Sequence, residues 1–220
     1  MAIRSRYVPA LRFDSLTPLY DAVVRTTTRE RRFKRALIAQ ANGQAGHTVL
    51  DLATGTGTLA IWMKSECAAA DVTALDGDPK ILEIAKRKAR AAGIDITWVQ
   101  GYSTDLPFPD QRFDRVLSSL FFHHLVWDDK VATAREIHRV LKPGGEVHVA
   151  DWGRPSNRIM RGLFFAIQLL DGFENTRGHV DGRLETLFKD AGFGGVRATQ
   201  SFDTVYGTLV LYRAHRTGQP

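Results

Sequence analysis

The sequence predicts an α/β fold built on a doubly wound, mostly parallel β-sheet that ends in an antiparallel C-terminal hairpin. Three observations carry this prediction. From residue 47 onward, short apolar segments rich in β-branched residues alternate with longer helical segments. The first apolar segment passes directly into a glycine-rich turn, LATGTGT, and then into a helix. Near the C-terminus, two strand-like segments follow one another with no helix between them. Such alternation favours βαβ units with right-handed crossovers.

Each element follows from a local pattern. The helix expected over 79–93 begins with Pro79 and ends at Gly93, and the LKPGG stretch predicts a turn after the helix at 128–141. The expected strands, seven in all with the hairpin, are 48–53, 71–76, 96–101, 112–120, 145–152, 193–202 and 207–216. The expected helices are 15–25, 28–42, 57–66, 79–93, 128–141, 156–171 and 181–191.

Length and composition are those of an ordinary globular chain. The 220 residues are 44% hydrophobic and 25% charged, and we see neither a secretory signal nor an apolar run of the roughly 18 residues that cross a membrane. The single cysteine, Cys67, excludes an internal disulfide and favours a reducing, cytoplasmic setting. We expect a basic N-terminal helical cap over 1–44 and one domain over 45–220.

The positive charge is concentrated at the N-terminus. Residues 1–40 hold nine basic and three acidic residues, which accounts for the whole net charge of +6. Such a segment attracts anionic membrane surfaces, nucleic acid or acidic substrates, although it is also typical of a solvated helix face.

The glycine-rich turn at 53–58 leaves three kinds of ligand to compare. No lysine follows Gly57, which excludes the GxxxxGK[ST] phosphate loop. Only a weak GxGxxA match to the dinucleotide fingerprint remains. The third ligand is S-adenosylmethionine, with Asp51 near the end of the first strand. Asp76 ends the second strand, where either nucleotide family uses a carboxylate for ribose hydroxyls, or where it caps the turn before Pro79.

Four stretches together resemble the class I S-adenosylmethionine-dependent methyltransferases, especially the branch containing ubiquinone/menaquinone C-methyltransferases. They are VLDLATGTG (49–57), ALDGDPKILEIAKRKA (74–89), GYSTDLPFPDQRFDRVLSSLFFHHL (101–125) and LKPGGEVHVADWGRP (141–155). The resemblance covers residues 45 to 155 and implies a Rossmann-like fold, methyltransferase activity and S-adenosyl-L-methionine as cofactor.

The resemblance also implies roles for individual residues. The turn with Ala53, Gly55 and Gly57 would pass the methionine part of the cofactor, with Asp51 supporting the turn or meeting the amino group through water. Asp76, with Gly77 beside it, would bind the ribose hydroxyls. Gly101, Tyr102 and Ser103 would flank the adenine, and backbone carbonyls around Ser118 and Ser119 would face the methionine ammonium.

Two positions depart from the family pattern. Tyr102 stands where the family usually has an acidic residue that accepts from the adenine amino group. The Tyr102 hydroxyl could take that role, its ring could stack on the base, or Asp105 could substitute. Ala53 stands where many relatives have glycine. In this respect the sequence resembles the quinone branch of the family.

Methyl transfer from a sulfonium needs alignment, exclusion of water and, for some acceptors, proton removal, so it carries no fixed catalytic signature. We consider four catalytic candidates: His123, His124, Asp151 and Tyr20. His123 and His124 follow the fourth strand and Asp151 ends the fifth, at the edge where open α/β sheets bind ligands. Each also has a structural interpretation, as a packing histidine or a turn-stabilising carboxylate. Tyr20 would help to cover the cofactor. We expect no metal site.

The insertion at about 154–180 is expected to shape the acceptor pocket, although its apolar spacing also suits a core-facing helix. The predicted function is methyl transfer by in-line displacement to a small, apolar or lipid-like acceptor, such as a lipid or quinone. NPPY-like, Pro-Cys and multi-thiol patterns are absent, which excludes adenine-N6, cytosine-C5 and arsenite methyltransferases. RNA methylation through the basic segment and non-catalytic cofactor binding are the alternatives. Nucleic acid is the less favoured partner. We expect a cytoplasmic protein. We also expect residues 1–40 to contact the inner face of an anionic membrane peripherally.

Overall fold

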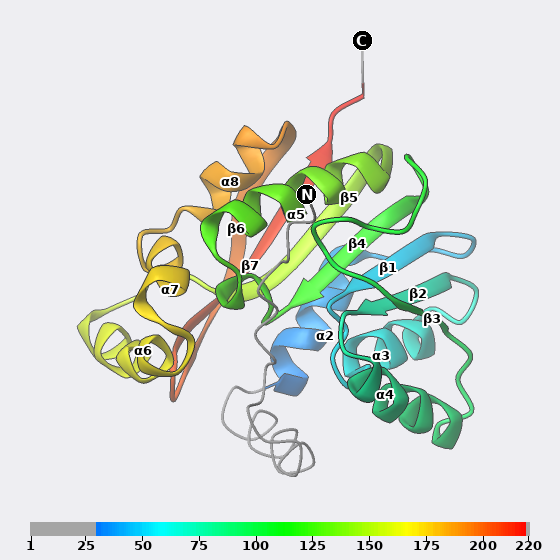
Figure 1. The fold of residues 1–220 in the computed structure, drawn as a ribbon, viewed down its shortest axis with the longest axis horizontal. Helices are drawn as coiled ribbons and strands as arrows, with labels where there is room; N and C mark the ends of the chain where they lie inside the picture. The colour runs from blue at the N-terminus through cyan, green and yellow to red at the C-terminus, as the bar shows by residue number, and fades with distance from the viewer. Residues whose placement is uncertain (1–29, 219–220) are drawn as a thin grey trace, which may run out of the picture.

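The computed structural model describes residues 30–218 and contains one mixed seven-stranded sheet in the order β3-β2-β1-β4-β5-β7-β6 (Figure 1). The strands are β1 (Thr48–Leu52), β2 (Asp71–Asp76), β3 (Thr97–Gln100), β4 (Phe113–Ser119), β5 (Leu141–Trp152), β6 (Phe193–Thr204) and β7 (Gly207–Arg216). The first five strands are parallel, and β7 is antiparallel to both of its neighbours. This confirms the predicted doubly wound sheet with its closing hairpin.

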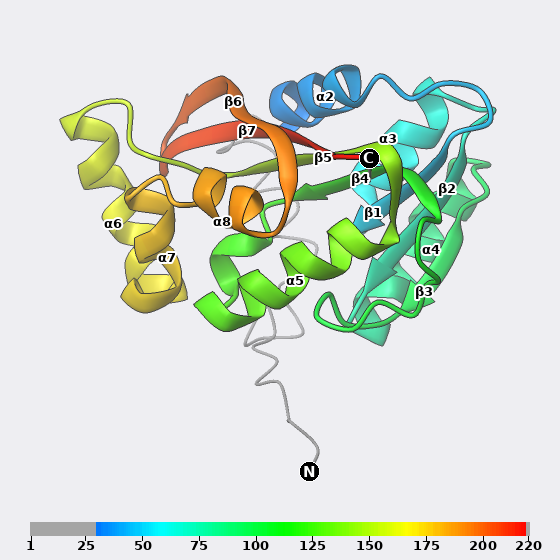
Figure 2. The same cartoon turned by 90° about the horizontal axis from the view of Figure 1, so that it is seen from above.

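Helices cover both faces of the sheet. They are α2 (Glu30–Ala41), α3 (Thr58–Glu66), α4 (Pro79–Ala91), α5 (Trp127–Val140), α6 (Arg158–Asp171), α7 (Phe173–Val180) and α8 (Leu184–Asp190), with a short 3₁₀ helix, η2 (Phe122–His124). Figure 2 shows α2 and α3 on one face and α5 and α8 on the other, while α6 and α7 lie beyond the ends of the C-terminal strands.

Alternation along the strands divides the core into two apolar layers. Val49 of β1 packs with Phe33 and Leu37 of α2 on one face. The next residue, Leu50, packs with Ile137 of α5 on the other. Because successive side chains of a strand point to opposite faces, continuously apolar strands bury both faces.

The chain order reverses between β1 and β4. β1 pairs in parallel with β2 on one side and with β4 on the other. Connections from neighbouring strands therefore leave in opposite directions at the carboxyl ends of β1 and β4, and doubly wound sheets bind their ligands at this switch point. The glycine-rich turn and the residues that follow β4 lie at this edge.

The N-terminal helix of the described region is tied to the last strand. Gln40 at the end of α2 donates from Nε2 to the carbonyl oxygen of Tyr212 in β7 (3.1 Å). Its side chain also bonds Thr199 of β6 and His148 of β5. The first described helix and the C-terminal hairpin thus share one polar network.

Three local features differ from the sequence-based expectations. The LKPGG stretch, expected as a turn, belongs to β5, where a register shift opposite Phe113–Arg115 and a left-handed Gly144 (φ +75°) absorb the bend. Neither η2 nor α7 was expected, because each is too short to show helical periodicity. The helix expected at 15–25 lies outside the described residues.

Candidate functional site

The turn after β1 has a backbone that favours glycine. Ala53, Gly55 and Gly57 all have positive φ, at +56°, +57° and +77°. A Cβ atom at Gly57 would lie 2.9 Å from both the Ala85 side chain and the Trp98 ring. Gly57 is therefore required both by its conformation and by close packing against α4 and β3. Ala53 adopts the same left-handed region with a side chain, which costs conformational energy.

Two aspartates stabilise this turn by accepting hydrogen bonds from it. Oδ2 of Asp51 accepts hydrogen bonds from Thr54 Oγ1 (2.6 Å) and from the backbone N–H of Ala60 (3.0 Å). Oδ2 of Asp76 accepts from the backbone N–H of Gly55 (2.8 Å). The turn is thus joined to its own helix by one carboxylate and to the end of β2 by the other.

A third contact comes from Lys88, which sequence reasoning missed. Its ammonium donates to the hydroxyls of Thr56 (3.0 Å) and Thr58 (2.9 Å), which follow Gly55 and Gly57. Lys88 lies 30 residues from Thr58 in the chain, and no local pattern in the helix expected at 79–93 marks its partners. Lys88 holds the outer side of the turn.

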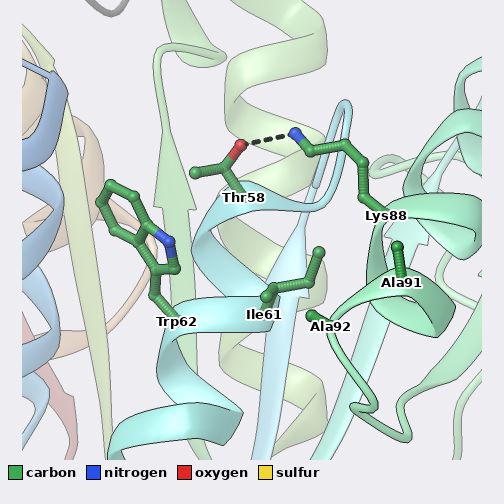
Figure 3. Close-up of a pocket in the computed structure, with 6 residues that line it drawn as sticks. All are labelled: Thr58, Ile61, Trp62, Lys88, Ala91 and Ala92. Atoms are coloured by element: carbon green, nitrogen blue, oxygen red, sulfur yellow. Dashed lines mark hydrogen bonds between the residues drawn. The ribbon is translucent and has the colours of Figure 1, made fainter.

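An open pocket of about 350 Å³ lies between α3 and α4, behind this turn (Figure 3). Ile61, Trp62, Ala91 and Ala92 form its apolar walls, and Thr58 and Lys88 supply its polar atoms. Figure 3 shows the Lys88 ammonium directed at the Thr58 hydroxyl rather than away from the protein. The pocket therefore borders the glycine turn on its helix side and is separate from the sheet edge.

The residues after β2 and β3 lie together beside Asp76. Gly101 donates from its backbone N–H to the Asp76 carbonyl oxygen (3.1 Å). The Tyr102 ring lies 3.2 Å from the position that a Cβ atom of Gly77 would occupy, and the side chain is 50% exposed. The Ser103 hydroxyl is buried and lies 2.8 Å from Thr133 Oγ1 of α5. Tyr102 therefore presents its ring at the edge, whereas the Ser103 side chain faces α5.

A buried polar cluster lies at the carboxyl ends of β4 and β5. His123 Nδ1 lies 2.7 Å from Oδ1 of Asp151, and Asp151 is fully buried. Oδ2 of Asp151 accepts from the backbone N–H groups of Phe121 (3.0 Å) and Phe122 (2.7 Å), and Oδ1 accepts from Trp152 N (2.7 Å). Asp151 thus fixes both the backbone before His123 and the imidazole ring itself.

The ionisation of Asp151 sets the tautomer of His123. Burial alone would raise the pKa of the Asp151 carboxyl, but the charge and hydrogen bond of His123, the nearby His179 and the N–H of Trp152 hold it well below its usual range. An ionised carboxylate only accepts hydrogen bonds, so the bond between His123 and Asp151 places a proton on Nδ1 of His123.

Two further members of this cluster were not expected from the sequence. His179 of α7 is fully buried, and its Nδ1 lies 2.7 Å from the Trp152 carbonyl oxygen and 3.8 Å from Asp151 Oδ1. Burial lowers the pKa of His179 to about 4, so the ring is neutral. Lys130 of α5 donates to the carbonyls of Leu125 and Asn175, and burial lowers its pKa to about 8. Both depend on α7, which the sequence pattern did not reveal.

Comparisons with known proteins identify the family to which this chain belongs. A family profile described as a methyltransferase domain matches residues 49–145. A ubiquinone/menaquinone biosynthesis C-methyltransferase from Shewanella is 30% identical over 93% of this chain and 88% of its own length. A demethylmenaquinone methyltransferase from Thermus thermophilus is 35% identical over 65% of this chain. The chain belongs to the class I S-adenosylmethionine-dependent methyltransferases.

The same family appears among solved structures. An S-adenosylmethionine-dependent methyltransferase from Aquifex aeolicus superposes with a TM-score of 0.68 at 18% identity, over 94% of this chain and 100% of its own. At that identity the likeness concerns the fold. The stretch matched to the Thermus thermophilus methyltransferase spans 65% of that protein, just under two thirds of its length.

The residues of this chain fit the family's cofactor. Oδ1 of Asp76 accepts from Asp78 N (3.0 Å) and Oδ2 from Gly55 N, and an ionised carboxylate has about four lone-pair positions. Capacity therefore remains for hydroxyls of a ribose. Burial raises the pKa of Asp76. Asp51 is more deeply buried, and its pKa is raised to about 6 by that burial despite the Thr54 hydrogen bond. A nearby ammonium would favour the ionised form of either group.

The remaining predicted residues of the methyltransferase are placed as follows. Ser118 is buried and donates from Oγ to the Leu52 carbonyl oxygen (3.0 Å), while Ser119 is half-buried and pairs with Ala150 of β5. Asp105 is exposed, and its N–H donates to the Tyr102 carbonyl oxygen (3.2 Å). The rings of His123 and His124 are 4.0 Å apart. Tyr20 lies outside the described residues.

Two absences hold for residues 30–218. No cluster of three or more His, Cys, Asp or Glu side chains there could hold a metal ion. No helix within that range is long and apolar enough to cross a membrane.

Proposed function

We propose that this chain transfers the methyl group of S-adenosylmethionine to a ring carbon of a small, apolar hydroxylated aromatic acceptor of the quinol type. The names of the two curated relatives support this acceptor class. The structural observation that carries the proposal is the buried His123–Asp151 pair at the edge of the sheet. Methylation of a ring carbon needs proton removal, whereas many heteroatom acceptors already offer a lone pair.

The proposed cofactor contacts follow the arrangement around the glycine turn. Asp76 and Gly77 hold the ribose, and Gly101, Tyr102 and Ser103 flank the adenine. The turn with Ala53, Gly55 and Gly57 passes the methionine part, with Asp51 and the backbone around Ser118 and Ser119 facing its ammonium. When bound, S-adenosylmethionine supplies a methyl group on a sulfonium sulfur, which becomes a neutral thioether.

His123 is proposed as the base and Asp151 as its positioning residue. Nε2 of His123 takes the hydroxyl proton of the acceptor, which increases electron density on the adjacent ring carbon. Asp151 keeps the ring oriented and stabilises the imidazolium that results. His124 is the second candidate base, and Tyr20 is proposed to help cover the cofactor. The ring carbon then gains the methyl group as the methyl–sulfur bond breaks, and its own C–H bond breaks to restore the aromatic ring. Because the hydroxyl regains its proton, one methyl group has replaced one ring hydrogen and one proton is released overall.

The insertion at 154–180 is proposed to shape the acceptor pocket. Phe164 of α6 is buried against Trp152, with ring centroids 5.7 Å apart, and Trp152 directly follows Asp151. Aromatic side chains thus extend from the polar cluster toward α6, which suits an apolar acceptor. We further propose that the basic residues among 1–40 attract an anionic membrane surface from which such an acceptor is drawn.

The test is transfer of a labelled methyl group by the full chain to three acceptors: a naphthohydroquinone with an unsubstituted ring carbon, its O-alkylated ether, and total RNA. We expect one added methyl group on the ring carbon of the hydroquinone only, identified by mass spectrometry and NMR. Transfer to RNA that is lost at high salt would replace this proposal by RNA methylation. Tight cofactor binding without transfer to any acceptor would favour a non-catalytic protein.

A further inference from the structure

The outer face of α6 exposes large apolar side chains. Ile159 is 72% exposed, Leu169 63%, Phe165 48% and Leu163 37%, and Phe173 at the start of α7 is 50% exposed. The rings of Phe165 and Phe173 contact each other, with centroids 5.6 Å apart. We call these five residues the α6 apolar face. Contiguous apolar exposure of this kind marks an interaction site in a soluble fold.

The arrangement along the helix makes this face continuous. Ile159 and Leu163 form one row at i, i+4 spacing, and Phe165 and Leu169 form a second. Gly162 and Ala166 lie between the rows and are too small to shield them. The opposite side of α6 is already used, because Phe164, Ile167 and Gln168 are buried against the protein. The outer face is therefore an additional surface and not an unfilled part of the core.

The charges around the face identify its partner. Residues 153–173, which span this face, contain three arginines, Arg154, Arg158 and Arg161, and one acidic residue, Asp171. All three arginines are exposed. Arginine side chains beside apolar ones on a surface helix let the apolar groups enter lipid while the guanidinium groups stay at the anionic headgroups.

The same charges disfavour a second copy of the chain. In a two-fold symmetric dimer the same surface meets itself. Two α6 helices that pack in parallel about such an axis would bring the arginines of both copies together, and like charges across an interface oppose association. A helix of 14 residues is also only about 21 Å long, which is small for a stable dimer interface.

We propose that the α6 apolar face docks on an anionic lipid bilayer, with α6 lying in the plane of the headgroups. This surface shares no residue with the basic segment 1–40. Because Phe164 packs on Trp152 from the inner side of the same helix, docking would place the polar cluster next to the layer that dissolves apolar acceptors. The inference concerns lipid binding and does not depend on which acceptor is methylated.

The test is sedimentation of the full chain with vesicles of phosphatidylglycerol and phosphatidylcholine, compared with vesicles of phosphatidylcholine alone. We expect binding to the anionic vesicles, and a loss of about tenfold in the partition coefficient for Leu169→Ser, because an apolar side chain no longer leaves water. Val126→Ser is the matched control, since Val126 is apolar and 45% exposed but lies outside α6 and α7. Thermal unfolding confirms that both variants fold.

Two double charge-reversal variants distinguish binding through the α6 apolar face from general electrostatic attraction between the protein and the vesicles. Arg154→Glu with Arg158→Glu should abolish binding, whereas Arg87→Glu with Arg90→Glu on α4 changes the net charge equally and should weaken it only slightly. Equal loss in both double variants would overturn the proposal, as would binding by Leu169→Ser equal to that of the parent chain. Loss only on reversing Arg4, Arg6 and Arg12 would assign the contact to the N-terminus. A dimer that dissociates in Leu169→Ser, seen by sedimentation velocity, would assign the face to a second copy.

Discussion

His123 Nδ1 lies 2.7 Å from Oδ1 of Asp151, and the same carboxylate accepts three backbone N–H groups. In Asp151→Asn the amide N–H₂ replaces one of the two accepting oxygens. It must therefore face at least one backbone N–H donor, and that hydrogen bond is lost. We expect the free energy of unfolding to fall by about 2–4 kcal/mol. The rate of methyl transfer should fall by about 100-fold, because His123 loses its orientation. Denaturant titration and single-turnover kinetics measure the two effects.

Asp114→Asn is the control for this prediction. Asp114 accepts hydrogen bonds from Lys142 Nζ and Thr48 Oγ1 (2.8 Å each) near the amino ends of β1 and β4, far along the strands from the site. Its replacement should cost stability and leave the transfer rate unchanged. Equal rate losses in the two variants would contradict a specific role of the His123–Asp151 pair.

Asp76→Ala should weaken the binding of S-adenosylmethionine by about 100-fold, because two hydrogen bonds to a charged group are lost. Asp78→Ala provides the comparison two residues away. Asp78 caps α4 by accepting from Lys80 N (2.8 Å), so its loss should cost about 1 kcal/mol of stability without changing the dissociation constant. Calorimetric titration of both variants decides the matter, and an unchanged constant for Asp76→Ala would refute the ribose contact.

The raised pKa of Asp51, about 6, gives cofactor binding a pH dependence. Below that value the carboxyl is neutral, and above it the carboxylate would attract the methionine ammonium in the proposed complex. Affinity should therefore rise by about tenfold between pH 5 and pH 7 and then level off. In Asp51→Asn this rise should disappear. A pH dependence that persists in the variant would show that another group is responsible.

Lys88→Met should weaken cofactor binding by about three- to tenfold, because Thr56 and Thr58 lose the donor that holds the turn from outside. Lys86→Met is the matched lysine on the same helix, and it removes only an exposed pair with Glu83 (2.7 Å). Fluorescence titration of the two variants should separate them. Identical dissociation constants would mean that the turn keeps its shape without Lys88.

Ala53→Gly should stabilise the protein by about 0.5–1 kcal/mol, because glycine adopts the positive φ of +56° without strain. Ala60→Gly, a few residues later within α3, should instead destabilise it by about 1 kcal/mol through lost helix propensity and packing. Thermal unfolding that shows Ala53→Gly to be more stable and Ala60→Gly less stable than the parent chain would support strain in the turn. Destabilisation by both substitutions would argue against it.

The parts of the site that follow from local sequence could be predicted. Asp51, Gly55, Gly57 and Asp76 lie where short apolar strands end, and parallel strands bring their carboxyl ends to one edge. The proximity of His123 and Asp151 follows in the same way, because His123 comes after β4 and Asp151 lies at the end of the adjacent β5.

The parts that depend on packing between distant elements could not be predicted. Lys88 reaches its threonines only because α3 and α4 lie side by side on one face of the sheet (Figure 3). His179 enters the cluster through α7, an eight-residue helix without a recognisable period. The Ser103 side chain lies against Thr133 through the packing of α5, while its place beside the adenine stays a prediction.

The network around Gln40 has a consequence for how the chain is made. Gln40 is synthesised well before its partners Thr199 and Tyr212, which lie more than 150 residues later in the chain. Moreover, β7 lies between β5 and β6, so the sheet is incomplete until the final strand is synthesised. Helix α2 can therefore bury its apolar side against β1 and α3 early in synthesis, whereas its polar contacts through Gln40 form only after β6 and β7 have been made.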